Sequence, residues 1–380
     1  MNKSLNLIRL EDALIRAGMN QSALAAKLGV SREAVSNWFR GESFPQPDKL
    51  VRIGMAVGLG FDELVVIPPP APETVPVVTF RKKGNRKTRD EHLDHARETG
   101  ELLKRLVPYL PEQDLTQPPI LKDPCNDYAY IQRVAALTRK EMGLERKKVV
   151  KVIDLIGKFN ELHAVVVPVL WGAREQHGNA LNVYLPDSRT LWIFLNLDSN
   201  AIDFKFWMAH ELGHALAPAY GGEDGEDFAD GFAQAFLYPK THVEGLWPDL
   251  VREQTVANRI ERIRDEAREH MISPYTIRLA VEAWEKAADR ASVDLGLSTT
   301  FMAGVKNFGK DYKTIVEALA GKAVPDPGDY VRIGREAFES SFFEALARYC
   351  RKTSGAEHYI HRILGLPLAD AKALVGELTK

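Results

Sequence analysis

The sequence predicts a mainly α-helical protein with a small β-sheet, an α+β class, arranged in more than one domain. Three observations predict it: closely spaced helical segments over residues 1–66, short β-branched and aromatic runs between residues 163 and 197, and helical periodicity after residue 250. A chain of 380 residues is also longer than one ordinary core accommodates. We expect an all-helical N-terminal bundle, a mixed central core and a helical C-terminal region.

The composition excludes several classes of function. The chain has 50 basic and 52 acidic residues and a formal net charge of -2, so it is neither a bulk polyelectrolyte binder nor a membrane-surface protein. Its two cysteines, Cys125 and Cys350, lie too far apart for a CxxC cluster. No stretch reaches the roughly 18 apolar residues of a spanning helix, and the N-terminus lacks a signal-peptide pattern. We expect a cytoplasmic protein.

The first 66 residues have the pattern of a helix-turn-helix. The apolar positions that would anchor its two helices are Leu24, Ala25, Leu28, Val35 and Trp38. Gly29 ends the first helix and Ser31 caps the second. The positions left facing outward, which would meet bases and phosphates of double-stranded DNA, are Gln21, Ser31, Arg32, Glu33, Ser36, Asn37 and Arg40. The alternative is a helical hairpin whose polar face only meets water.

This unit resembles the XRE (Cro-like) helix-turn-helix family over its whole length, through "QSALAAKLGVSREAVSNWFRG" and the "P.PDKLVRIGMAVGL" that follows. The resemblance implies a DNA-binding domain over residues 1–66 that recognises an operator. Because the charge of the unit is close to balanced, it would bind DNA weakly alone. A homodimer or another partner is therefore implied.

A proline-rich and basic linker is predicted over residues 67–90, from "VIPPPAPETVP" and "TFRKKGNRK". An amphipathic helix follows within residues 88–110, with Leu93, Ala96, Leu102, Leu103 and Leu106 on one side. We then expect helices at about 128–142 and 147–162, strands in 163–171 and 190–197, and a further strand and turn in 179–188. The predicted domains are 91–245 and 246–380.

The motif "HELGH" places His210 and His214 one helical turn apart, with Glu211 beside them. Two imidazoles at this spacing can reach one Zn²⁺ ion, which needs a third protein ligand and an open position. A metzincin would have a glycine and a histidine three and six residues after the motif, where this chain has Ala217 and Tyr220. The metzincin class is excluded.

The nearby candidates for the third ligand are Glu223, Glu226, Asp227, Asp230 and His242. Glu223 and Asp224 fall in the glycine-rich "YGGEDGE", which we expect to be a mobile loop. Glu226 opens the helical segment "EDFADGFAQAFLYP" and is the best ligand, since a ligand needs a regular element behind it. Asp230, one turn later, is placed to orient a liganding histidine.

From about residue 80 to 239 the chain resembles the ImmA/IrrE family of zinc-dependent peptidases, through "TFRKK", "YIQRVAALTRKEMGL", "IFLN", "KFWMAHELGHAL" and "EDFADGFAQAFLYP". The resemblance implies a zincin-like peptidase core in which His210, His214 and Glu226 hold the metal and Glu211 is the general base. It also implies cleavage of a repressor in a stress or mobile-element response. The chain departs from the family's pattern at Asp230, where the family commonly has Asn, and at "FLYP", where the family has "LLMP".

Alternatives remain open at this stage. Manganese could replace zinc, and the oxyanion stabiliser could be Tyr220, Tyr238 or His242, each of which could equally be structural. The peptidase fold could serve a non-proteolytic XRE regulator or antitoxin as a sensor or interaction module. The C-terminal helices could sense a ligand or dimerise, or simply pack.

Overall fold

The computed structural model describes residues 4–40, 43–60, 64–66, 77–80, 98–111, 120–144, 149–172 and 180–380. The chain divides into two compact units, Met1–Thr74 and Val75–Lys380, called unit 1 and unit 2 below. Among the described residues, no helix combines the length and the apolar character that crossing a membrane requires.

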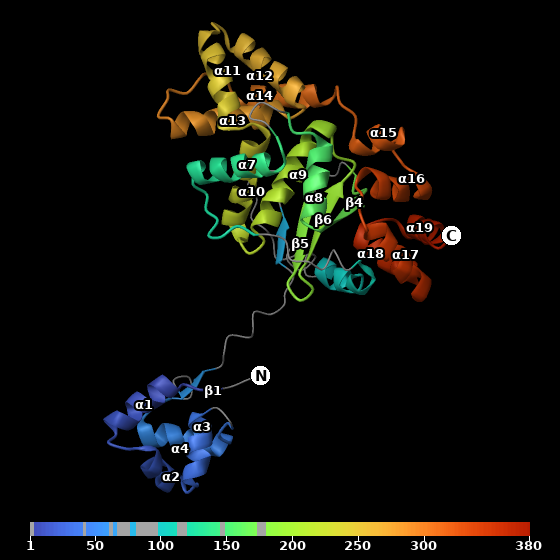
Figure 1. Cartoon of the computed structure of the whole chain (residues 1–380). Helices are drawn as coiled ribbons and strands as arrows, with labels where there is room; N and C mark the ends of the chain where they lie inside the picture. The colour runs from blue at the N-terminus through green and yellow to red at the C-terminus, as the bar shows by residue number, and fades with distance from the viewer. Residues whose placement is uncertain are drawn as a thin grey trace. The chain divides into compact units, whose positions relative to one another are not determined.

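Unit 1 is a helical bundle, as predicted (Figure 1). Its helices are α1 (Leu7–Arg16), α2 (Gln21–Leu28), α3 (Arg32–Phe39) and α4 (Pro47–Val57). A short antiparallel pair of strands, β1 (Ser4–Leu5) and β2 (Val65–Val66), joins its two ends. All five predicted anchor side chains are buried: Leu24, Ala25, Leu28, Val35 and Trp38.

The turn between α2 and α3 forms for the predicted reasons. Gly29 has φ +67°, a left-handed conformation that glycine adopts without steric cost, and its N–H bonds to carbonyls of α2. The hydroxyl of Ser31 accepts a hydrogen bond from the N–H of Ala34 and so caps α3. These two local signals fix where one helix stops and the next begins.

Unit 2 contains a four-stranded sheet in the order β3-β5-β6-β4. Its strands are β3 (Val77–Phe80), β4 (Ala164–Val169), β5 (Ala180–Leu185) and β6 (Thr190–Asn196). The hairpin β5–β6 is antiparallel, β3 pairs antiparallel with β5, and β4 runs parallel to β6. β4 and β6 are buried along their whole length, because helices and loops cover both faces of the sheet.

The helices before and beside the sheet are α7 (Tyr128–Glu141), α8 (Val152–Glu161), α9 (Ala201–Leu216) and α10 (Gly222–Leu237). A helical stretch at 98–104 and η1 (Val107–Tyr109) precede them. α9 packs against α8, α10 and the sheet, and α10 packs against α7 and α9. The helix that carries "HELGH" is therefore surrounded by structure on several sides.

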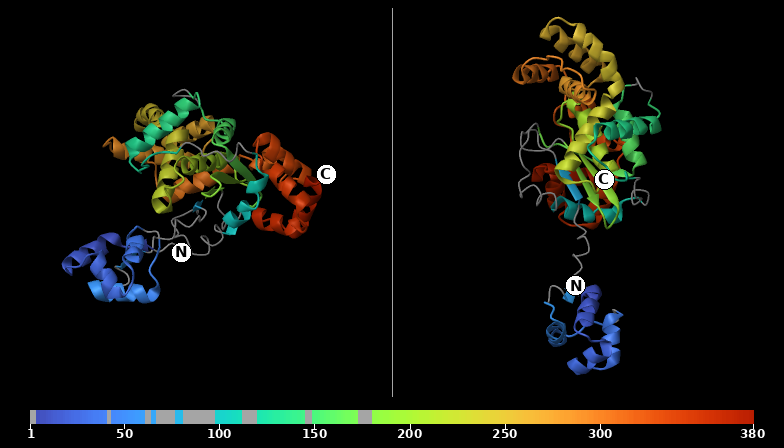
Figure 2. Two further views of the ribbon diagram at one scale, coloured as in Figure 1. Left: turned by 60° about the horizontal axis from the view of Figure 1, so that its bottom comes forward. Right: turned by 90° about the vertical axis from the view of Figure 1, so that its left-hand side faces the viewer.

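The remaining helices are α11 (Lys240–Arg252), α12 (Val256–His270), α13 (Pro274–Ala287), α14 (Ser298–Gly309), α15 (Ile315–Ala320), α16 (Pro327–Arg332), the π-helical η3 (Ile333–Ala337), α17 (Phe342–Lys352), α18 (Ala356–Leu364) and α19 (Leu368–Leu378). In Figures 1 and 2, α11–α14 gather at one end of unit 2 and α17–α19 near the other. One buried apolar cluster continues from Leu102 to Leu378, so these late helices share the core of the sheet.

Several boundaries differ from the prediction. α8 begins at Val152 rather than near 147, and β3 lies inside the stretch that we expected to be linker. α10 begins at Gly222, so Glu223 and Asp224 belong to its first turn and not to a loop. The predicted positions Leu93 and Ala96 lie outside the described residues. The elements expected around 128–142, 163–171, 179–188 and 190–197 are confirmed.

Candidate metal centre

The helix α9 delivers both histidines of "HELGH" to one place. Asn200 caps its start by accepting a hydrogen bond from the N–H of Ile202. The amide nitrogen of Asn200 donates to the carbonyls of Gly309 and Tyr312, which ties the helix to residues more than a hundred positions later. The helix is buried from Trp207 to Leu216, so its histidines sit in the protein interior.

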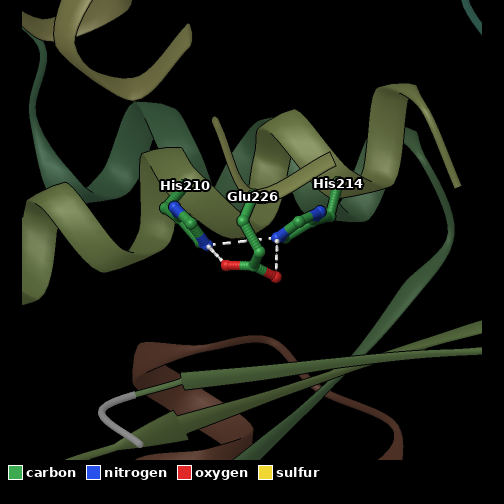
Figure 3. A group of neighbouring side chains, drawn as sticks. All are labelled: His210, His214 and Glu226. Atoms are coloured by element: carbon green, nitrogen blue, oxygen red, sulfur yellow. Dashed lines mark hydrogen bonds and ion pairs between the residues drawn. The ribbon is translucent and has the colours of Figure 1, made fainter. Parts of the chain in front are cut away.

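Helix α10 brings Glu226 to the same place from the other side. The Nε2 atoms of His210 and His214 lie 3.1 Å apart. The carboxylate of Glu226 lies 3.5 Å from Nε2 of His210 and 3.3 Å from Nε2 of His214. Figure 3 shows both imidazoles directed at that carboxylate.

These three side chains fit a zinc ion. Four ligands at about 2.0–2.1 Å in a tetrahedron stand about 3.4 Å from one another, close to the separations seen here. Both oxygens of Glu226 are also buried, and among the described residues their polar neighbours are the two imidazoles at 3.3 and 3.5 Å, so a cation held between the three groups would compensate the buried charge. Neutral imidazole and carboxylate are the ligands that zinc commonly takes in catalytic sites. His210, His214 and Glu226 therefore form a group able to hold a metal ion.

Asp230 lies one turn beyond Glu226 and faces the other side of a histidine. Its Oδ1 atom is 2.9 Å from Nδ1 of His210. Burial disfavours a charged imidazole, but the hydrogen bonds to Asp230 and Glu226 outweigh burial and raise the pKa of His210 to about 9. An acceptor on Nδ1 fixes the ring so that Nε2 is the atom presented to Glu226 and His214.

Glu211 follows His210 directly and is 2% exposed. Its Oε2 atom is buried and has no hydrogen-bond partner among the residues that the structure describes. Burial raises the pKa of Glu211 to about 8; the charge of His210 opposes this shift and that of Glu226 adds to it. A carboxylate held in this way is suited to take up and release a proton near neutral pH.

The other residues considered as ligands or stabilisers lie elsewhere. Glu223 and Asp227 are exposed on α10. Tyr238 donates its hydroxyl to Glu266, 2.9 Å away, and its ring packs against His242. Tyr238 follows the C-terminal end of α10, whereas Glu226 lies near the start of that helix. Its hydroxyl is therefore not placed to stabilise charge beside the metal ligands.

Tyr220 is nearer, in the turn between α9 and α10, where its ring contacts Phe228 at 6.0 Å between centroids. The structure gives it no contact with His210, His214 or Glu226 among the interactions described. We therefore assign the role of oxyanion stabiliser to none of the three candidates.

Gly213 is a positioning residue that the sequence reasoning missed. A Cβ atom at this position would lie 2.9 Å from Cα of Ala229 and 3.3 Å from the side chain of Phe232. Only glycine therefore lets α9 approach α10 this closely between the two histidines. The spacing of small residues, Gly213 in one helix and Ala229 and Ala233 in the next, was the available signal.

A second missed feature is the segment 120–127, which crosses the connection between α9 and α10. The N–H of Leu121 donates to the carbonyl of Leu216 at 2.7 Å, and the side chain of Asn126 donates to the carbonyl of Asp224 at 3.1 Å. The two bonds attach this segment to the end of one ligand-bearing helix and the start of the other. No local pattern in residues 120–127 predicts these long-range contacts.

In unit 1, the predicted DNA-contacting residues lie on α3, at its cap or at the start of α2. Gln21, Ser31, Arg32, Glu33 and Arg40 are exposed, and Ser36 and Asn37 are half-buried. The guanidinium of Arg40 donates to Oδ1 of Asn37 at 2.6 Å. Arg32, Ser36 and Arg40 follow one another at helical spacing, so these three residues lie toward one side of α3.

The helix-turn-helix bundle of unit 1 is typical of DNA-binding domains. The buried His-His-Glu cluster of unit 2 is typical of a metallopeptidase-like domain. The comparisons agree: residues 10–64 match the helix-turn-helix family model, and residues 174–269 match the peptidase M78 model, described as an IrrE N-terminal-like domain. Residues 10–64 thus form an XRE-type helix-turn-helix domain, and residues 174–269 form a domain similar to the IrrE N-terminal-like family. No curated protein and no solved structure is significantly similar to the chain.

Proposed function

We propose that the chain is a DNA-binding transcription regulator whose second unit is a zinc-dependent endopeptidase. Its substrate is a repressor or a similar partner protein, cleaved in a stress or mobile-element response. The observation that carries the enzymatic part is the convergence of His210, His214 and Glu226 with Glu211 beside them. The family matches support a metallopeptidase-like domain and a DNA-binding domain.

The residues would divide the chemistry as follows. His210, His214 and Glu226 would hold the ion, and Zn²⁺ in such a site lowers the pKa of water and polarises a carbonyl. Glu211 accepts the proton of the attacking water and passes it to the leaving amine. Asp230 holds His210 in the orientation that exposes its Nε2 atom.

Unit 1 would direct this activity to an operator. Arg32 and Arg40 are exposed on or at the end of α3, and Asn37 contacts Arg40, so cationic and amide groups face one side. Such groups position a recognition helix on phosphates and base edges. A homodimer would place two such helices on two half-sites.

One observation favours a second candidate, a regulator that does not cleave protein. His210, His214 and Glu211 are 1%, 3% and 2% exposed, so little of their surface is accessible to a peptide chain. In that case the zincin-like unit would serve as a sensor or interaction module for the DNA-binding unit.

Glu211→Gln separates the two candidates, because it keeps the shape of the side chain and removes the base. The matched control is Glu223→Gln, at an exposed position of α10. Both proteins are assayed for zinc content, for DNA binding and for cleavage of a proteome-derived peptide library followed by mass spectrometry. The enzyme proposal expects wild type and control to cleave, and Glu211→Gln to bind zinc and DNA but lose cleavage by about 10²-fold or more. Wild-type protein that cleaves no peptide, or a Glu211→Gln variant that cleaves as wild type, overturns it.

A further inference from the structure

Solvent reaches the candidate metal centre at its carboxylates. The side chains of His210 and His214 are 1% and 3% exposed, whereas those of Glu226 and Asp230 are 22% and 30% exposed. Both carboxylates lie on the face of α10 that is turned toward His210. A peptide that reaches the ligands therefore has to approach from the side on which these two carboxylates are accessible, and it contacts the accessible residues around them.

Helix α9 leaves one aromatic residue accessible next to its first ligand. The helix is buried except at Ala201, Asp203 and Phe206. Phe206 is one turn before His210, so the two side chains share one face of the helix. Their ring centroids lie 6.4 Å apart. A half-buried ring beside a metal ligand is available to a side chain of the substrate, since binding sites are lined mainly by apolar and aromatic groups.

Trp207 supports the ring of Phe206 from behind. The two rings meet edge to face, with centroids 5.6 Å apart and planes at 85°. Trp207 also meets the ring of His210 edge to face, at 5.8 Å, and is only 9% exposed. A buried aromatic side chain therefore fixes Phe206 relative to a metal ligand. Such support is what a residue needs if it is to discriminate between substrates.

We infer that Phe206 determines substrate specificity by contacting a side chain next to the cleaved peptide bond, and that this side chain is apolar: leucine, isoleucine, methionine or phenylalanine. The inference deepens the proposed peptidase function and rests on it. An acidic side chain at this position would lose its water against the Phe206 ring without gaining a partner. It would also be repelled by the accessible carboxylates of Glu226 and Asp230. Apolar residues should therefore be preferred over acidic ones.

The peptide library that tests the enzyme also tests this inference. We expect wild-type cleavage sites to carry apolar residues, at one position flanking the cleaved bond, at least about tenfold more often than acidic residues, corrected for their frequency in the library. Phe206→Lys should shift this preference toward acidic residues, which a merely structural role of Phe206 would not do. Phe206→Leu should keep the apolar preference. The matched control is Met302→Lys, at a 40% exposed position of α14, which should cleave as wild type.

Binding without cleavage gives a second measurement. A peptide that spans a frequent cleavage site is titrated calorimetrically into zinc-loaded Glu211→Gln protein, beside the same peptide with aspartate in place of the apolar residue. The apolar peptide should bind at least about tenfold more tightly. Adding Phe206→Lys to this protein should remove most of the difference. Phe206→Ser, a smaller change, should also lower the apolar preference and decides the question if Phe206→Lys does not fold.

The outcomes separate this inference from the proposal on which it rests. Wild-type protein that cleaves without a preference, that prefers charged residues at both flanking positions, or whose preference is unchanged in the folded Phe206 variants overturns the inference and leaves the enzyme proposal standing. Zinc-loaded wild type that cleaves no peptide overturns the enzyme proposal and this inference with it. The zinc content of each variant distinguishes an altered subsite from a lost metal.

Discussion

The Nδ1 atom of His210 lies 2.9 Å from the Oδ1 atom of Asp230, while the Nε2 atom of the same ring lies 3.5 Å from the carboxylate of Glu226. Both carboxylates come from α10, one turn apart, and both face one imidazole of α9. The second helix therefore supplies a ligand and also orients another ligand. The pairing links metal affinity to a residue that does not touch the metal.

Asp230→Ala should lower zinc affinity by about 10–100-fold, because His210 loses the acceptor that fixes its ring. Asp230→Asn should recover part of this loss, since its amide oxygen can still accept the hydrogen bond. Competition with a chromophoric zinc chelator measures both. Asp227→Ala, at an exposed position of the same helix, is the control. Equal affinities for wild type and Asp230→Ala would show that the contact does not orient a ligand.

Gly213→Ala should weaken both the fold and the metal site. The added Cβ would meet Cα of Ala229 at 2.9 Å, so α9 and α10 must separate, at a cost of about 1–3 kcal/mol. Because Glu226 lies on α10, zinc affinity should fall with stability. Urea unfolding and zinc titration measure the two effects.

Gly157→Ala provides the contrast, because this glycine lies inside α8 with nothing within 4 Å of the added Cβ. It should stabilise the protein by up to about 1 kcal/mol through helix propensity and leave zinc affinity unchanged. If Gly213→Ala behaves in the same way, the close approach of the two helices does not position the site.

The stability of unit 2 should depend on pH through His270, which is 4% exposed. Burial and the charges of His242, Lys205 and Arg139 lower its pKa to about 4. The unfolded chain takes up this proton near pH 6.5, so the stabilising contribution is complete above about 6.5 and is lost as the pH falls toward 4. The loss amounts to at most about 3 kcal/mol.

Replacing His270 by Phe keeps a ring against Tyr238 and removes the titration. The free energy of unfolding, measured in urea between pH 4 and 7, should then vary less with pH than in wild type. Replacing the exposed His358 by Gln is the matched control for the loss of an imidazole. A His270→Phe slope equal to that of wild type would assign the acid sensitivity to other groups.

Local signals in the sequence were sufficient for most elements. Gly29 and Ser31 mark the helix-turn-helix because capping depends on the immediate backbone. The spacing of His210 and His214 depends only on helix periodicity, so their proximity was predictable. The prediction of Glu226 as a ligand depended on which of the nearby acidic residues lies on a helix. The structure places its carboxylate beside both histidines.

Features that depend on distant parts of the chain were not predictable. The bond from Asn200 to the carbonyl of Gly309 joins residues that no periodicity relates. β3 lies in a stretch that the prolines had suggested was linker, because pairing with β5 decided its conformation. We expected the helix to begin at Glu226, because Gly221 and Gly222 indicated a loop. α10 instead begins at Gly222, whose φ of +71° is a conformation that glycine adopts without steric cost.

The central claim is that His210, His214 and Glu226 hold a zinc ion. Protein purified without added metal, analysed by inductively coupled plasma mass spectrometry beside His214→Ala, tests it most directly. The account predicts about one zinc per wild-type chain and little in the variant, with the variant still folded by circular dichroism. Wild-type protein without zinc that also fails to take up added zinc, or equal zinc in both proteins, would contradict it.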